Sequence, residues 1–155
     1  MDTYKVKWTQ LSQDIFYLLS LRSGERLSQR EIAKILKVSP TAVANSIKIL
    51  RESNLIGIEK TKTINFISFN RDNPKAIDLK RVENLRNIYG SGLSDYLEVE
   101  LAGGTVILFG SYSRGEDTEN SDIDIAVIGR KDKMLHVEKY EKILKRKINV
   151  NFYDS

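Results

Sequence analysis

Two short stretches of the chain carry residues whose types and spacing could do chemistry. Gly110 and Ser111 follow an apolar run, 105–109, so a residue without a side chain and a hydroxyl lie where backbone amides would open toward a ligand. Such an arrangement receives phosphate. Asp122 and Asp124 are two residues apart, and on a strand both carboxylates would project from one face. Paired carboxylates of this kind hold one or two hard cations.

The composition restricts which metal could bind. The 155 residues include no cysteine and a single histidine, His136, which argues against thiolate sites, most multi-histidine zinc sites and a disulfide framework. Any metal must bind to oxygen atoms, which favours magnesium, manganese or calcium. His136 has no cluster of ligating residues beside it, and we expect an exposed or packing role for it.

The elements that position these residues follow a small α/β pattern in the C-terminal half. Ile123 and Ile125 alternate with the two aspartates and would face the opposite side of the same strand. A short mixed sheet with flanking helices is therefore expected. The apolar patterns predict helices over about 93–101 and 135–144 and strands at 105–109, 121–128 and 147–153.

This ordered set of motifs resembles the nucleotidyltransferases of the DNA polymerase β superfamily, and the minimal nucleotidyltransferases in particular. Their signature is an apolar strand, Gly-Ser, a variable loop and Asp-x-Asp. Here Gly110-Ser111, Arg114-Gly115 and the Asp-x-Asp of residues 122–124 occur in that order, within about residues 90–153.

The resemblance implies a role for each matching residue. Gly110 and Ser111 would hold a nucleoside triphosphate, ATP by default, with Arg114 as a supporting phosphate contact. Asp122 and Asp124 would be the catalytic pair that binds Mg²⁺ or Mn²⁺. Two such cations would activate an attacking hydroxyl and neutralise the leaving pyrophosphate.

One departure from the family pattern bears on activity. Members that transfer nucleotides usually place a third carboxylate on the next strand, but here that strand offers Asn149 or Asn151. An amide oxygen can bind a metal, but an amide cannot accept the acceptor's proton and does not offset the metal's charge. The resemblance therefore implies a nucleotidyltransferase with an incomplete acidic triad, and weak or absent catalysis is one of the alternatives that follow.

The N-terminal half has a different plan. Apolar spacing predicts a helix over 9–21, Ser28 and Glu31 form a capping box that opens a second, and Ser39-Pro40 opens a third that ends near Ser53. Two short alternating segments within 56–68 then predict a hairpin with a basic tip. Three helices and a basic hairpin resemble a winged helix-turn-helix domain, over about residues 8–70.

A winged helix-turn-helix domain implies contact with DNA through its third helix. That helix would bury Val43, Ile47 and Leu50 and would present Thr41, Asn45 and Lys48 to base edges, with Lys60 and Lys62 of the wing near phosphates. Residues 1–73 hold 12 basic and 7 acidic side chains, against 13 and 14 in residues 74–155. Glu52 on the same face counts against DNA, and such domains also dock proteins or dimerise.

The sequence thus predicts an α+β protein: a winged helix-turn-helix domain (1–72), a linker helix (73–92) and a minimal nucleotidyltransferase domain (93–155). One hypothesis is an enzyme that moves AMP or another nucleotide to a protein or nucleic-acid hydroxyl; an antitoxin acting on a toxin partner is one form. A second is a nucleotide-binding regulator of DNA without catalysis, and a third is a protein-docking adaptor. The longest apolar run, 15–19, is far too short to span a membrane, so we expect a cytoplasmic protein that could form a homodimer.

Overall fold

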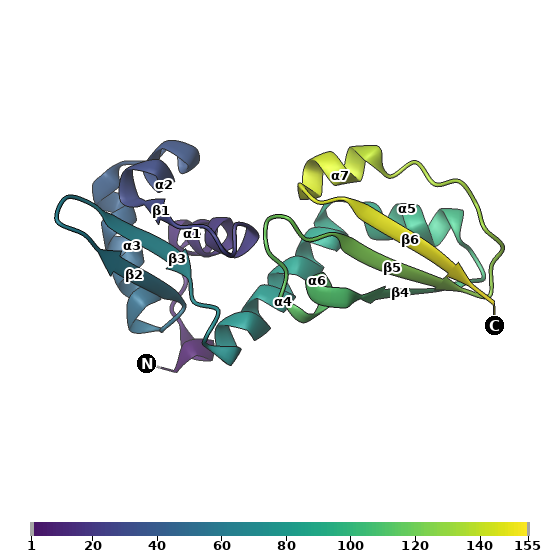
Figure 1. Ribbon diagram of the computed structural model, residues 1–155, viewed down its shortest axis with the longest axis horizontal. Coiled ribbons are helices and arrows are strands. Elements are labelled where there is room, and N and C mark those ends of the chain that lie inside the picture. The colour runs from purple at the N-terminus through teal and green to yellow at the C-terminus, as the bar shows by residue number, and fades with distance from the viewer. Residues whose placement is uncertain (1, 155) are drawn as a thin grey trace. The chain divides into compact units, whose positions relative to one another are not determined.

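The helices of the N-terminal region begin where side chains satisfy their free backbone amides. The computed structural model describes residues 2–154, and after a 3₁₀ turn at Thr3–Lys5 it has α1 at Gln10–Leu21, α2 at Gln29–Leu36 and α3 at Pro40–Glu52 (Figure 1). The predicted capping box at the start of α2 is confirmed, since Ser28 and Glu31 exchange two hydrogen bonds of 2.7 and 3.2 Å. Ser39 caps α3 by accepting from the backbone amide of Ala42.

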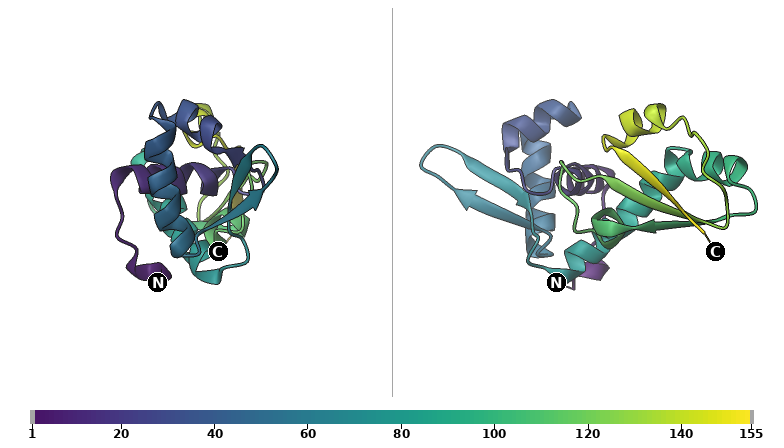
Figure 2. Two further views of the ribbon diagram at one scale, coloured as in Figure 1. Left: turned by 90° about the vertical axis from the view of Figure 1, so that its left-hand side faces the viewer. Right: turned by 45° about the vertical axis from the view of Figure 1, so that its right-hand side comes forward.

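A small antiparallel sheet forms the wing. Strands β2 (Ile56–Lys60) and β3 (Asn65–Phe69) pair as a hairpin that projects beyond the three helices (Figure 2). The second strand begins only at Asn65 because Thr61 and Ile64 bond to each other across the tip. Strand β1 (Leu27–Ser28), which pairs with β3, was not predicted, because two residues are too few to show alternation.

The core of this part of the chain is apolar and continuous. Val43, Ile47 and Leu50 of α3 are all buried, as their spacing predicted. They pack with residues of α1, α2 and the wing, among them Ile15, Phe16, Leu19, Ile32, Leu55 and Ile67. This packing leaves the opposite side of α3 to solvent.

A long helix, α4 (Pro74–Gly90), follows the wing. The chain divides into two compact units between Lys80 and Arg81, inside this helix, which lies within the range 73–92 predicted as a linker helix. The second unit continues with α5 (Leu93–Glu100), β4 (Thr105–Phe109), α6 (Gly110–Arg114), β5 (Ile123–Ile128), α7 (Glu138–Leu144) and β6 (Ile148–Tyr153).

The sheet of the second unit is mixed, as expected. Its order is β4-β5-β6, with β4 and β5 antiparallel and β5 and β6 parallel. Alternate residues of β5, Ile123, Ile125 and Val127, are buried against apolar side chains of α5 and α7. Their neighbours therefore project from the other face, which is where Asp124 lies.

Two elements of the second unit begin two or three residues later than predicted. Helix α7 begins at Glu138 and not at 135, because the backbone amide of His136 donates to the hydroxyl of Tyr96 and Leu135 packs on the core without being helical. Strand β5 begins at Ile123, whose backbone amide donates to the carbonyl of Lys147, so Asp122 lies just before the strand.

Over the described residues no helix is both long and apolar enough to cross a membrane.

Candidate functional site

The two predicted metal ligands converge on one side-chain amide. Asn149 of β6 lies directly opposite Asp124 of β5. Its Nδ2 is 3.0 Å from Oδ2 of Asp122 and 3.3 Å from Oδ1 of Asp124. Both carboxylates therefore project from the same face of the sheet although Asp122 precedes the strand. Each is half-buried, so a ligand can reach them.

The structure distinguishes between the two asparagines that the sequence left open. Asn149 contacts both carboxylates, whereas Asn151 pairs with Ala126 and is exposed. Residues two apart on a strand are separated by about 6.6 Å, so Asn151 lies further along the same face. Of the two candidate positions, Asn149 is thus the one that lies against both aspartates.

Gly110, which belongs to the predicted phosphate-binding motif, lies against Asp124. The last residue of β4, Phe109, lies opposite Asp124, and the chain then turns at Gly110 with a φ of +78°. A Cβ atom at this position would collide with the Asp124 carboxylate. Because of both the backbone conformation and the close approach, this position requires glycine.

The short helix α6 places its residues in different environments. Ser111 is half-buried, and Ser113 donates from its hydroxyl to the Gly110 carbonyl at 2.8 Å. Tyr112 is buried in the core. Arg114 lies on the surface, where its Nε donates to Glu116 at 2.8 Å. The structure therefore brings Gly110, but not Arg114, into contact with the aspartates.

A buried polar cluster holds the loop that connects the two motifs, and the sequence analysis missed it. The amide of Asn84, on α4, donates to the Tyr112 carbonyl and to Asp117, both at 2.8 Å. The other carboxylate oxygen of Asp117 accepts from Arg146, also buried, at 3.2 Å. Arg146 in turn donates to the Glu119 carbonyl. Asn84 lies four residues before buried Ile88 and so on the same face of the helix. A polar residue on this buried face was the sequence signal that could have revealed the cluster.

The side-chain oxygens at this site fit a hard divalent cation to which the protein supplies only a few ligands. Asp122 and Asp124 supply carboxylate oxygens, and the Asn149 amide would supply its oxygen after a half-turn that removes its two hydrogen bonds. Within residues 2–154 no group of three or more His, Cys, Asp or Glu side chains is placed to hold a metal ion. The protein would therefore leave most coordination positions to phosphate oxygens and water.

The residues expected at DNA all lie on the surface of the first unit. Thr41, Asn45 and Lys48 are exposed along α3. Lys60 ends β2 and Lys62 lies at the tip of the wing, and both are exposed. Glu52 is exposed at the end of α3. One face of α3 and the tip of the wing thus present polar and basic side chains to solvent, with one acidic residue at the end of the helix.

Comparison with known proteins agrees with this two-part plan. Residues 12–63 match a family model described as an HTH domain, and residues 92–153 match one described as a nucleotidyltransferase domain. The chain thus joins a winged helix-turn-helix domain to a nucleotidyltransferase domain. None of the curated proteins matches the chain.

Several solved structures are similar to part of the chain. Reduced HlyU from Vibrio cholerae is 18% identical with a TM-score of 0.45, and the match covers 53% of this chain and 82% of that one. A variant of Lactococcus lactis ZitR in complex with DNA is 25% identical with a TM-score of 0.43, over 64% of each chain. The adhesin competence repressor AdcR from Streptococcus pyogenes is 26% identical with a TM-score of 0.42, over 62% of this chain and 72% of that one. The match therefore spans less than two thirds of ZitR.

Proposed function

We propose that the chain is a metal-dependent nucleotidyltransferase that moves a nucleoside monophosphate, AMP in the first instance, from a triphosphate to a hydroxyl. The observation that carries the proposal is the convergence of Asp122 and Asp124 on one amide, with the Gly110 turn against them. Carboxylates held side by side bind Mg²⁺ or Mn²⁺. The acceptor is a hydroxyl of a protein, such as a toxin partner, or of a nucleic acid.

The residues of the chain divide the work of such a transfer. Gly110 and Ser111 hold the triphosphate through backbone amides and a hydroxyl, and Asp122 and Asp124 hold the cations beside it. Bound cations neutralise the charge that develops on the leaving pyrophosphate. Asn149 cannot take a proton from the acceptor, so we expect slow transfer.

The test is a calorimetric titration of ATP and then of the other triphosphates in the presence of Mg²⁺, with pyrophosphate release followed in the same samples. The double variant Asp122→Ala/Asp124→Ala should lose binding by at least tenfold. A matched control, Asp132→Ala/Asp154→Ala, removes two exposed acids elsewhere and should bind normally. Slow metal-dependent pyrophosphate release by the parent and the control, but not by Asp122→Ala/Asp124→Ala, would support the transferase. If the parent protein binds no triphosphate, the proposal is refuted.

A second candidate function is a regulator whose nucleotidyltransferase domain binds a nucleotide without chemistry. The neutral Asn149 in contact with both aspartates favours it. Binding that depends on Asp122 and Asp124 but gives no pyrophosphate would support this function. It also predicts that nucleotide changes DNA affinity by a coupling free energy of about 1–3 kcal/mol.

In both cases we propose that the winged helix binds DNA in the cytoplasm. The support is the exposed row Thr41, Asn45 and Lys48 together with Lys60 and Lys62. Fluorescence anisotropy with a labelled duplex at several salt concentrations tests this. Lys48→Ala and Lys62→Ala should each weaken binding and reduce the salt dependence by about one counterion, whereas Lys131→Ala, an exposed lysine of the second unit, should not. Binding that none of these changes affects would refute the assignment.

A further inference from the structure

The strand β4 has a free edge with an unusual composition. In the part of the chain that the structure describes, β4 pairs with β5 alone, so its other edge presents unpaired backbone groups. Four of its five residues are exposed, including Val106, Ile107 and Phe109 with 40%, 40% and 38% of their surface accessible. Residues 101–113 contain no charged side chain at all. Edge strands normally carry a charge, a proline or a bulge that prevents pairing.

Two other edge strands of the described chain do carry such protection. The opposite edge strand of the same sheet, β6, bears Asn149 and Asn151 and is flanked by residues 145–147, which are all basic, and by Asp154. In the wing, β2 ends in Glu59 and Lys60. The β4 edge is therefore selectively apolar, which indicates a surface that is covered by a partner and not merely one left unprotected.

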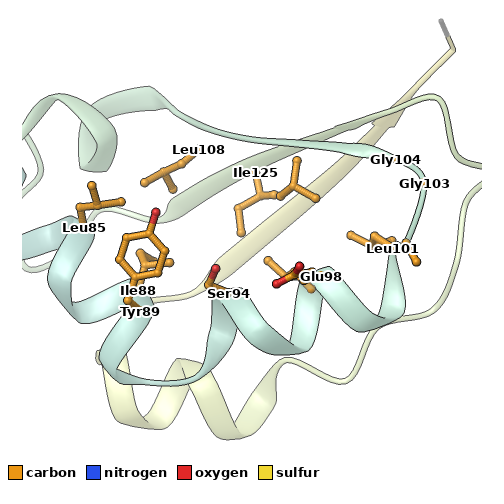
Figure 3. Close-up of a pocket in the computed structure, with 13 residues that line it drawn as sticks. Leu85, Ile88, Tyr89, Ser94, Glu98, Leu101, Gly103, Gly104, Leu108 and Ile125 are labelled. Carbon is orange, nitrogen blue, oxygen red and sulfur yellow. The ribbon is translucent and has the colours of Figure 1, made fainter.

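An apolar groove of about 640 Å³ runs beside this strand. Figure 3 shows Leu85 and Tyr89 of α4 near one end and Glu98 of α5 near the other, where Leu101 follows the helix. Leu108 and Ile125 of the sheet lie along the wall. Val106 also lines it, so the groove and the strand edge share side chains. Leu85 and Tyr89 are exposed, and they extend the apolar surface away from the strand.

We infer that the β4 edge pairs with the β4 edge of a second copy of this chain, antiparallel and about a twofold axis at Ile107. Antiparallel self-pairing satisfies the free backbone groups of both copies at once. It places Thr105 opposite the partner's Phe109 and Val106 opposite the partner's Leu108. Because the whole segment 101–113 is neutral, pairing it with a second copy places no like charges opposite each other. A strand from another protein would not in general meet this condition.

The pairing has consequences for both faces of the sheet. Val106 and Leu108 of the two copies would lie together on the groove side, so the two grooves would join into one apolar surface. Asp124 of each copy would remain on the opposite, open face. From strand spacings, the two Asp124 residues would lie about 20 Å apart, which leaves both sites accessible. The inference does not rest on the proposed function.

The area available sets the expected strength of the dimer. Leu85, Tyr89, Val106, Ile107 and Phe109 expose 38–61% of their surfaces, which amounts to about 900 Å² over two copies, below the roughly 1,200 Å² of a stable specific interface. The dimer should therefore form at micromolar and not nanomolar concentrations.

Sedimentation velocity of the full chain from 1 to about 300 μM tests the inference. The average mass should rise from 17.8 kDa toward twice that value. Ile107→Lys should raise the dissociation constant by at least tenfold, while Val99→Lys, which changes an exposed valine of α5 outside the groove, should leave it unchanged. A parent protein that stays monomeric, or a dimer that Ile107→Lys does not weaken, overturns the inference. Thermal unfolding of each variant shows that it is folded.

A crosslinking experiment tests the register, since the chain has no cysteine of its own. Opposite residues of an antiparallel pair have Cα atoms about 4.5–5.5 Å apart, which is within disulfide range. Mild oxidation should convert most of an Ile107→Cys variant to a disulfide-linked dimer, and should convert little of Val99→Cys at the same concentration. Equal crosslinking of the two variants contradicts pairing at β4.

Discussion

Asn149 lies opposite Asp124 on the neighbouring parallel strand, and its amide donates to Asp124 and to Asp122 together. A neutral donor thus satisfies two carboxylates whose mutual repulsion would otherwise favour a bound cation. These two hydrogen bonds stabilise the paired carboxylates in the folded chain. A cation that the Asn149 oxygen coordinates would require the amide to turn and both hydrogen bonds to break, which would lower the affinity for the metal.

Replacing this amide by a carboxylate should reverse the balance. In Asn149→Asp three acids would meet without a donor, so we expect metal-free protein to lose roughly 1–3 kcal/mol of stability. Mg²⁺ or Mn²⁺ should restore it, with at least tenfold tighter metal binding and faster pyrophosphate release. Thermal unfolding with and without metal measures this. Asn151→Asp, on the same strand but away from the aspartates, is the control and should gain neither property.

Gly110 should not tolerate a side chain. In Gly110→Ala the positive φ costs about 1–2 kcal/mol, and the new methyl group must displace the Asp124 carboxylate. Nucleotide affinity measured by calorimetry should fall by at least tenfold. Gly103→Ala provides a matched control, because Gly103 also has a positive φ but meets nothing within 4 Å. It should lose stability but keep its affinity. Equal losses of affinity would mean that the close approach to Asp124 is unimportant.

The buried pair Arg146 and Asp117 should be essential to the folded second unit. Only 2% and 1% of their side-chain surfaces are accessible. In Arg146→Met the Asp117 carboxylate would stay buried without its cation, at a cost of about 3–5 kcal/mol. Lys147→Met changes the next, exposed residue and should cost less than about 0.5 kcal/mol. Urea denaturation measures both, and similar midpoints for the two variants would contradict the role of the pair.

The capping box of α2 predicts part of the acid sensitivity of the protein. Hydrogen bonds from Ser28, first from its backbone amide, lower the pKa of the Glu31 carboxyl below its ordinary value of 4.5. A carboxyl whose pKa is lower in the folded state stabilises the fold above pH 4.5, and this contribution disappears as the pH falls through the folded-state pKa. The melting temperature of Glu31→Gln should therefore be lower than that of the parent at pH 7 and should approach the parent's value at pH 3. A constant difference at both pH values would argue against this titration.

The sequence was sufficient for the elements whose signals are local. Caps at Ser28 and Ser39 and the apolar spacing of α3 predicted where helices begin and which face they bury, because hydrogen bonds and periodicity within one helix decide these features. Tertiary contacts overrode local pattern at Leu135, where packing and the Tyr96 hydroxyl hold the chain out of α7.

The residue types of the candidate site were evident from the sequence alone, because Gly-Ser and Asp-x-Asp are short motifs on consecutive elements. The choice of Asn149 over Asn151 depended on the register of β5 against β6, which are joined by a long crossover that no local pattern constrains. The same holds for the approach of Gly110 to Asp124 and for the Asn84, Asp117 and Arg146 cluster, which joins residues 29 to 62 positions apart. Only the packed structure decides such contacts, because they depend on the positions of whole elements and not on neighbouring residues.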